Sequence, residues 1–483
     1  STNAVLRWTA TLSPRLFLDA HAGATHRRDD LKPWTSGADG YGRPLYVSQD
    51  WDQDLGVSAG FGRFTIDDRR TRQIGAALTW TPEGGALGSH EWLAGFEADL
   101  ATWGQTSGYT GGTFVQLRKQ TAPDLTDPNS YQERYVNYLQ DPSIRERGFY
   151  GALFLQDRWN PVEDVTVTAG LRWERNRLDS ERGNDLSLAI LSPRAAVSWD
   201  FTGDDRSKLA LSWGRYYERV PLYLSRVLDG GHATYKDTYV NGAKTAHAIY
   251  NDVAALALGG VKNQSQDEWT LTLQHQGGSD LVLGARAVYR DLNRLLETVG
   301  YVDPSTGAIR LLVMNPGHQT TPLLETWRGV LPDYAPFPKP RRRYGALELL
   351  LDKRFADRWF LHANYTWSRL RGNTAAGYDR GIPELAPNAT KEWDIPSAAW
   401  IANRFGYLPT DRTHQFKAVA GYRFDGGLLV GGTLRFDTGR PMDKIYDWPK
   451  KEVGHGKLLH VPRGTAGRLP SALTLNLHAE YTF

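Results

Sequence analysis

The chain has 483 residues, enough for two or three ordinary soluble domains or for one very large sheet. It contains no cysteine and has a formal net charge of +3, which excludes disulfides and a thiol nucleophile and gives no argument for a nucleic-acid partner. Its mean hydropathy is −0.50 and no run of 18 apolar residues occurs, which excludes helical membrane proteins but not membrane β-barrels.

Alternation of apolar and polar residues predicts about fifteen strands in chain order. In the segment 359–367, for example, tryptophan, leucine, alanine, tyrosine and tryptophan alternate with mostly polar residues. The predicted strands are 4–12, 15–27, 69–81, 89–102, 148–159, 164–177, 189–201, 207–219, 266–276, 280–293, 341–354, 358–371, 411–424, 428–438 and 471–483. The segment 251–258 is the one ambiguous region, and we expect a short helix there.

The predicted connections alternate in length. Tight turns rich in glycine, proline, aspartate and asparagine join strands in pairs, as at 160–163 and 425–427. Between these pairs lie polar stretches of up to about fifty residues, such as 220–265 and 294–340. Short turns at one side and long loops at the other are typical of outer-membrane barrels.

The two faces of the predicted strands differ in chemistry. One is apolar with aromatic residues at its ends, as expected for a lipid-facing band, and the other carries ionisable groups that suit a hydrated lumen. The alternative is a secreted protein built of one-sided sheets. We predict an all-β fold, a transmembrane antiparallel up-and-down β-barrel with short periplasmic turns and long extracellular loops. The predicted lumen-facing residues are Arg215, Glu218, Arg219, His362, Lys417, Arg423, His478 and Glu480.

A series of short motifs is similar to the barrels of TonB-dependent outer-membrane receptors of the Oar-like subgroup. They are GYTGG at 108–112, FLQDRW at 154–159, VTAGLRWE at 167–174, SPR at 192–194, DDRSK at 204–208, WGRYYERVP at 213–221, LPTDRTHQF at 408–416, GGTLRFDTGRP at 431–441 and the terminal aromatic Phe483. The resemblance spans nearly the whole chain, and the motifs are specific as an ordered set rather than singly.

This resemblance implies a 22-stranded barrel in the outer membrane of a Gram-negative bacterium, with an N-terminal plug domain and energy supplied through TonB. The implied partners are therefore outer-membrane lipid and lipopolysaccharide, the plug, TonB and an unknown extracellular substrate. No plug sequence or TonB box is evident. We expect residues 1–483 to be a partial barrel domain, the C-terminal two-thirds of a larger receptor whose first strands and plug lie outside this chain.

Aromatic residues of the long loops are candidates for substrate binding. They are Trp34, Trp393, Trp400, Tyr407 and Trp448. Loop aromatics also occur at membrane interfaces and in loop packing, so this second interpretation stays open. Similarly, Arg215, Glu218 and Arg219 are either lumenal charges that contact a plug or mutually paired residues at a strand end.

No catalytic motif stands out, and we expect a protein that is not an enzyme. The segment 50–56 places oxygen ligands at alternate positions, like the start of a calcium loop, but loop position twelve is Phe61 rather than an acid. A solvated acidic loop is therefore favoured over a bound calcium ion, and no other cofactor is expected. The predicted function is import by an energy-coupled transporter. The alternatives are a passive porin-like channel and a surface adhesin or structural barrel.

Overall fold

The computed structural model describes most of the chain. The described residues are 1–32, 49–52, 57–59, 62–84, 87–120, 131–139, 143–181, 184–230, 234–250, 254–375, 378–379, 382–383, 391–447 and 457–482. Two of the predicted substrate-binding residues, Trp34 and Trp448, and the terminal Phe483 lie outside them.

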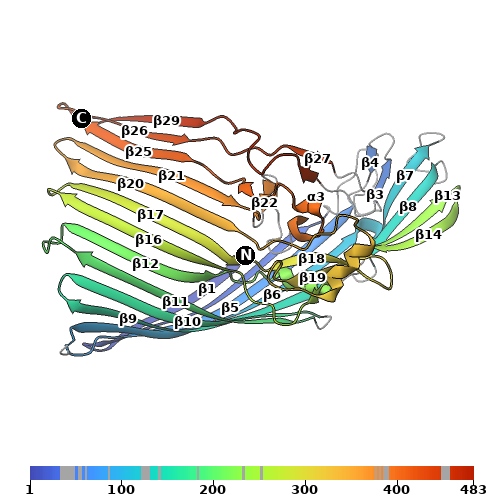
Figure 1. Cartoon of the computed structure of the whole chain (residues 1–483), viewed down its shortest axis with the longest axis horizontal. Coiled ribbons are helices and arrows are strands. Elements are labelled where there is room, and N and C mark those ends of the chain that lie inside the picture. Colours follow the sequence, from blue (N-terminus) through green and yellow to red (C-terminus); the bar gives the residue numbers. More distant parts are fainter. Residues whose placement is uncertain are drawn as a thin grey trace.

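One large antiparallel sheet dominates the molecule, and its strands follow one another in chain order (Figure 1). They are β1 (Thr2–Ser13), β2 (Leu16–Leu31), β5 (Arg63–Trp80), β6 (Ser89–Tyr109), β9 (Ser143–Val162), β10 (Val165–Asp179), β11 (Leu186–Asp200), β12 (Ser207–Tyr217), β16 (Ser265–Gly277), β17 (Leu281–Arg294), β20 (Arg342–Ala356), β21 (Trp359–Gly372), β25 (His414–Arg423), β26 (Leu428–Asp437) and β29 (Ala472–Tyr481). The short strand β24 (Gly406–Tyr407) pairs with β21 off this path.

Each of the fifteen predicted strands corresponds to one strand of this sheet, so the predicted all-β, up-and-down architecture is confirmed. The short connections lie at one end of the sheet and the long connections at the other, which are the left and right ends in Figure 1. We call these the turn end and the loop end. At the loop end, several strands are longer than predicted. The strand β6, for example, continues to Tyr109, whereas the predicted strand ends at residue 102.

The sheet has an apolar face and a polar face. On the apolar face of β10 and β11, Leu171, Trp173 and Leu191 are 48%, 42% and 51% exposed. About half of the surface of each of these side chains is left uncovered by the protein, as expected where lipid is the solvent. The opposite face of the same strands carries Arg172 and Glu174.

The sheet is open in the structure, because β1 and β29 stand at the two ends of the strand order. Nearly every residue of these two strands is exposed. An edge of this length leaves a row of backbone N–H and C=O groups without ladder partners, which barrels avoid by closure.

Smaller sheets lie at the loop end, in segments where the sequence indicated only loops. Six strands form one of them: β14 (Ala243–Tyr250), β13 (Thr234–Val240), β8 (Tyr131–Leu139), β7 (Phe114–Gln120), β3 (Gln49–Asp52) and β4 (Val57–Ala59). A second sheet contains β15 (Leu256–Ala257), β19 (Ile309–Met314) and β18 (Glu297–Val302). Two hairpins pair β22 (Tyr378–Asp379) with β23 (Ile382–Pro383), and β27 (Ile445–Asp447) with β28 (Lys457–Leu459).

Helices among the described residues are short. They are α1 (Tyr223–Asp229), α2 (Pro322–Glu325), α3 (Ala398–Ile401) and the 3-10 turns η1 (Thr110–Gly112), η3 (Thr326–Gly329) and η4 (Lys391–Trp393). None of the helices in the described part of the chain is long and apolar enough to cross a membrane. The helix expected at 251–258 is wrong for its described residues, which contain β15. That strand pairs in parallel with β19, a nonlocal contact that local sequence does not reveal.

The buried hydrophobic clusters lie mainly at the loop end. Their largest fully buried side chain is Trp327 of η3, whose indole N–H donates to the carbonyl oxygen of Gly300 at 2.8 Å. Leu224 and Leu228 of α1 pack with Leu178 of β10 in a neighbouring cluster. The long connections therefore fold as a packed unit above the sheet.

Candidate functional site

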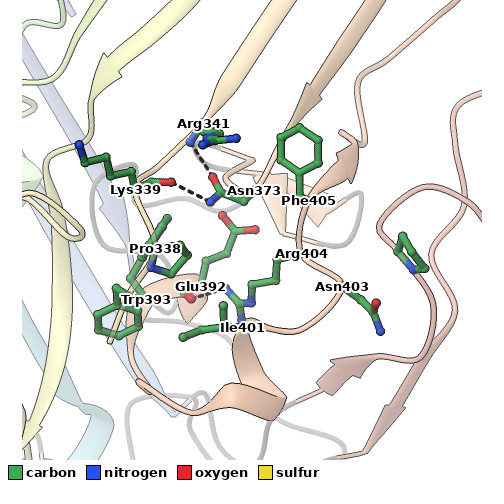
Figure 2. Close-up of a pocket in the computed structure, with 12 residues that line it drawn as sticks. Pro338, Lys339, Arg341, Asn373, Glu392, Trp393, Ile401, Asn403, Arg404 and Phe405 are labelled. Carbon is green, nitrogen blue, oxygen red and sulfur yellow. Dashed lines mark hydrogen bonds between the residues drawn. The ribbon is translucent and has the colours of Figure 1, made fainter. Parts of the chain in front are cut away.

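A cavity of about 500 Å³ lies among the loop-side connections next to the ends of β20 and β21 (Figure 2). Three cationic residues and three aromatic residues contribute to its lining. The residues around it are Phe337, Pro338, Lys339, Arg341, Asn373, Glu392, Trp393, Ile401, Asn403, Arg404, Phe405 and Pro462. Concave sites with apolar walls and a few polar groups are typical of ligand-binding pockets.

Asn373 fixes the two strand ends that frame the cavity. Its side-chain oxygen accepts a hydrogen bond from the backbone N–H of Arg341 at 2.6 Å, and its amide nitrogen donates to the carbonyl oxygen of Lys339 at 3.0 Å (Figure 2). The backbone N–H of Asn373 donates in turn to the carbonyl oxygen of Arg341 at 2.9 Å. One side chain thus completes the ladder between β20 and β21 where the strands separate.

Glu392 connects three loop segments beneath the cavity. Its carboxylate accepts hydrogen bonds from the Arg463 guanidinium at 2.5 Å and from the backbone N–H of Ala375 at 2.9 Å. Its backbone carbonyl accepts from the indole N–H of Trp400 at 3.2 Å and from the Arg404 guanidinium. Glu392 and Arg463 are 71 positions apart, so their contact holds two long connections together.

The Glu392 carboxylate remains charged although it is buried. Burial alone would raise its pKa, but the positive charges of Arg463 and Arg404 and the hydrogen bond from Ala375 more than offset this. The pKa of Glu392 is therefore lower than its ordinary value. The ion pair of Glu392 with Arg463 at the floor of the cavity is neutral, and Lys339 and Arg341 add positive charge to the lining.

Three predicted substrate-binding residues fall within the described part of the chain. Trp393 lines the cavity, is 3% exposed and packs edge-on against Phe337 with ring centres 5.6 Å apart. Trp400 is buried beneath the Arg404 guanidinium, 4.9 Å from its ring centre. Tyr407 stacks with the guanidiniums of Arg371 and Arg468. These residues support the loop structure, and a substrate-binding role stays a prediction.

Five predicted lumen-facing residues lie on β21, β25 and β29, on the face opposite the aliphatic residues. In β21, His362 follows Leu361 and therefore lies on the opposite face. Leu361 pairs with Ala420 on the apolar face. Lys417 and Arg423 share the polar face with His362, and Arg423 stacks on Phe355 at 5.4 Å. On β29, His478 and Glu480 lie 3.8 Å apart and are exposed.

In and just after β12, Arg215 and Arg219 bind the acids Asp267 and Asp99, which lie on other strands. Arg215 shares the strand face of Trp213, the apolar face, and binds Asp267 through two hydrogen bonds of 2.7 and 2.9 Å. Its position thus differs from the predicted lumenal one, because residues two apart in a strand share a face. Arg219 lies on the polar side and binds Asp99 at 2.6 Å. The backbone of Glu218 bonds to the segment 263–264.

A polar cluster on β6, β9 and β10 escaped the sequence analysis. The Arg172 guanidinium contacts Glu97 at 2.5 Å, Glu174 at 2.7 Å and the Tyr150 hydroxyl at 2.8 Å. Arg219 stacks on the other side of the cluster, 4.5 Å from the Tyr150 ring centre. Strand alternation alone already assigns Arg172 and Glu174 to the polar face, which is the signal that could have identified them.

A buried acid lies near α1, beyond the apolar band. Glu146, at the loop end of β9, accepts a hydrogen bond from the Ser225 hydroxyl. Burial raises the pKa of Glu146 to about 8, with a further contribution from the negative charge of Asp229. This carboxyl group therefore holds a proton through much of the neutral range.

The segment 50–56, which we interpret as a solvated acidic loop rather than a calcium loop, begins in β3, which ends at Asp52, and the residues that follow at 53–56 are outside the described part. The solvated loop stays a prediction, with a bound calcium ion as its alternative. Within the described residues, no group of three histidine or acidic side chains is arranged to hold a metal ion.

The fold defines a class of protein. A single antiparallel sheet with an exposed apolar face, a charged opposite face and segregated short and long connections is an outer-membrane β-barrel structure. Residues 1–209 match the family model described as an outer membrane beta barrel domain. The chain belongs to the outer membrane of a Gram-negative bacterium.

Among curated proteins, the chain is similar to the TonB-dependent transporter Oar of Myxococcus xanthus, with 28% identity over 444 residues. That match covers 81% of this chain and 40% of Oar. Two solved structures share the fold: the outer membrane transporter YddB from Escherichia coli, with 14% identity and a TM-score of 0.61, and the unliganded ferric citrate transporter FecA, with 12% identity and a TM-score of 0.53. Their matches cover 99% and 100% of this chain but 56% and 54% of the solved chains. The fold is that of an outer-membrane β-barrel, and over most of its length the chain is similar to the TonB-dependent transporter Oar.

Proposed function

We infer that the chain acts as the barrel of an energy-coupled outer-membrane transporter that captures a substrate with its loop-side segments and imports it. The observation that carries this inference is the similarity to the transporter Oar over 81% of the chain. The loop-side cavity supplies a place for capture. Because Lys339 and Arg341 contribute positive charge to its lining, it favours a ligand with anionic groups.

Two further elements belong to the proposal. The two open edges, β1 and β29, suit a barrel completed by additional strands, and the chain spans 40% of Oar and about half of each solved relative. A plug inside that barrel and TonB in the periplasm would provide gating and energy. Polar residues such as Arg172 and Arg219 would then face the plug.

Arg341 is the most informative residue to change. Its backbone groups maintain the contact with Asn373, so Arg341→Met alters the charge of the cavity and leaves these hydrogen bonds in place. Arg328→Met is the matched control, because Arg328 lies on the surface in an exposed ion pair with Glu325 and is not part of the cavity lining.

The test uses the native gene in its own host. Nutrients whose uptake depends on the gene are first identified by comparing the wild type with a deletion strain. Uptake of such a nutrient should stop when TonB is removed, and Arg341→Met should weaken it while Arg328→Met leaves it unchanged. Uptake that persists without TonB, together with a stable open conductance in planar bilayers, would favour the porin-like channel. A deletion that impairs attachment to surfaces and leaves all uptake intact would favour the adhesin.

A further inference from the structure

Strand pairing places the apolar face of β12, β16, β17, β20 and β21 in three parallel rows. Toward the turn end, one row is Leu211, Leu271, Ala287, Leu347 and Trp367. The next row is Trp213, Trp269, Tyr289, Gly345 and Arg369. The row nearest the loop end is Arg215, Asp267, Asp291, Arg343 and Arg371.

These rows mark the boundary of the lipid band on the loop side. The first row is aliphatic apart from Trp367, the second is mostly aromatic, and the third is entirely charged. Aromatic residues at the edge of an apolar band lie at head-group level, so the charged row is at the height of lipid phosphates. Any ligand of this row must therefore approach from the membrane surface rather than from the lumen.

In the charged row, the arginine on β12 has an acidic partner on β16, whereas the arginines on β20 and β21 outnumber the acids. On β12 and β16, Arg215 is neutralised by its two hydrogen bonds to Asp267. On β20, Arg343 reaches Asp291 only at 3.3 Å, and both side chains are substantially exposed.

The cations of β21 contact aromatic rings instead of acids. Arg369 lies over Trp367 at 5.3 Å from the ring centre, and Arg371 lies over Phe405 and Tyr407 at 5.5 and 5.1 Å. Among the described residues, neither guanidinium is in an ion pair. Of the three guanidiniums on β20 and β21, that of Arg343 is the one with a carboxylate partner among the described residues, Asp291.

Gly345 creates an opening between these charges. A Cβ atom built on Gly345 would have no other atom within 4 Å, so the aromatic row is interrupted at this position. Tyr289 flanks the opening on one side and Arg369 on the other, while Arg343 lies two residues along the same strand. We call the group Tyr289, Arg343, Gly345, Arg369 and Arg371 the arginine notch.

We propose that the arginine notch binds the phosphate of a lipid in the outer leaflet, which in this membrane is lipopolysaccharide. Planar guanidiniums bind phosphate through paired hydrogen bonds, and three of them surround an opening that admits a head group. The apolar row directly below, with Leu347 and Trp367 exposed at 39% and 40%, provides the surface for an acyl chain.

Within the described residues, the turn end of the same strands has no equivalent site. Its apolar face there carries Lys353, but this side chain is only 7% exposed, pairs with Asp280 and donates to the carbonyl oxygens of Arg354 and Ala356. The cation is thus fully engaged within the protein. The charge pattern selects the loop-side leaflet, and a phosphorylated lipid is the anion found at that depth.

The experiment compares native protein purified from outer membranes with three variants. Arg343→Gln/Arg369→Gln/Arg371→Gln removes the charges, Gly345→Leu fills the opening and keeps the charges, and Arg215→Gln is a control on the same row. The probes are purified lipid A with its phosphates, dephosphorylated lipid A and inorganic phosphate. Binding is measured by native mass spectrometry and by titration in detergent, and heat-modifiable gel mobility checks folding.

The triple variant should bind phosphorylated lipid A about a hundredfold more weakly, and Gly345→Leu about tenfold more weakly. Arg215→Gln should differ from the native protein by less than about twofold. Dephosphorylated lipid A should bind the native protein as weakly as the triple variant binds the intact lipid. Equal affinity of the triple variant and the control would overturn the proposal. Unchanged binding by Gly345→Leu would contradict a defined notch and indicate diffuse electrostatic attraction to the surface. Displacement of the lipid by millimolar inorganic phosphate would contradict a lipid site and indicate a site for a soluble anion.

Discussion

The buried ion pair between Arg463 and Glu392 should control how firmly the loop-side segments are closed. The two side chains are 5% and 2% exposed. Replacing one partner of such a pair leaves the other charge buried without full compensation, which typically costs about 3–5 kcal/mol. Arg463→Met should lie near 3 kcal/mol, because Glu392 keeps its contacts with Arg404 and Ala375. This corresponds to roughly a 150-fold larger population of the opened loops.

Hydrogen exchange measured by mass spectrometry on the native protein in membranes reports this population. The informative amides are those of Ala375, which bonds to the Glu392 carboxylate, and Tyr407, which bonds to the carbonyl oxygen of Arg463. Their protection should fall by about two orders of magnitude in Arg463→Met, provided that exchange follows local opening. The strands of the large sheet should exchange as before.

The matched control is Arg328→Met, which breaks the exposed pair between Arg328 and Glu325. These side chains are 63% and 53% exposed, so the loss should stay below about 1 kcal/mol, or about fivefold in exchange. A double variant, Arg463→Met with Glu392→Met, should be more protected than Arg463→Met alone, since no charge remains buried. The reasoning is refuted if Arg463→Met changes protection no more than the control does.

Three further predictions concern other parts of the molecule. The pKa of Glu146 is about 8 in the folded state, against an ordinary value of 4.5, so the free energy of unfolding should fall as pH rises from about 4.5 to about 8. Glu146→Gln should make the free energy of unfolding, measured by denaturant titration, depend less on pH in this range. Gly439→Ala would make its Cβ atom clash with the carbonyl oxygen of Leu469, so this variant should be cleaved faster by proteases in the connection before β29, whereas Gly345→Ala, with open space around its Cβ atom, should not. Arg172→Met leaves neighbouring carboxylates without their cation, and should lower the urea midpoint of unfolding in lipid vesicles by an amount equivalent to about 3 kcal/mol.

The strands of the large sheet could be predicted because their signal is local. In β21, Trp359, Leu361 and Trp367 share one face, and the alternation repeats in every strand with a tight turn at one end. The predicted limits agree best at the turn end, where lipid contact requires strict alternation up to the turn. At the loop end the strands extend into water, where either face tolerates polar residues, and the sequence no longer marks where they stop.

The loop-side structure could not be predicted, because its contacts join distant segments. The parallel pairing of β3 with β7 and the pair between Glu392 and Arg463 have no local pattern. Trp393 and Trp400 were identified as loop aromatics, but their burial depends on packing that only the fold provides. The chemistry of a cavity built from several loops is therefore invisible in a single sequence.

The loop-side cavity and the arginine notch are connected through the ends of β20 and β21. Consecutive residues of β20 face opposite sides, so Arg343 points toward the membrane while Arg342 points toward the loops. Phe405 links the two surfaces, since it lines the cavity and lies beneath the Arg371 guanidinium. A lipid phosphate that drew Arg371 toward the membrane would exchange a contact of about 0.5–1 kcal/mol with this ring for a stronger one with the phosphate. Lipid binding and loop closure would then depend on the same side chain, so the membrane surface would influence the loops that border the cavity.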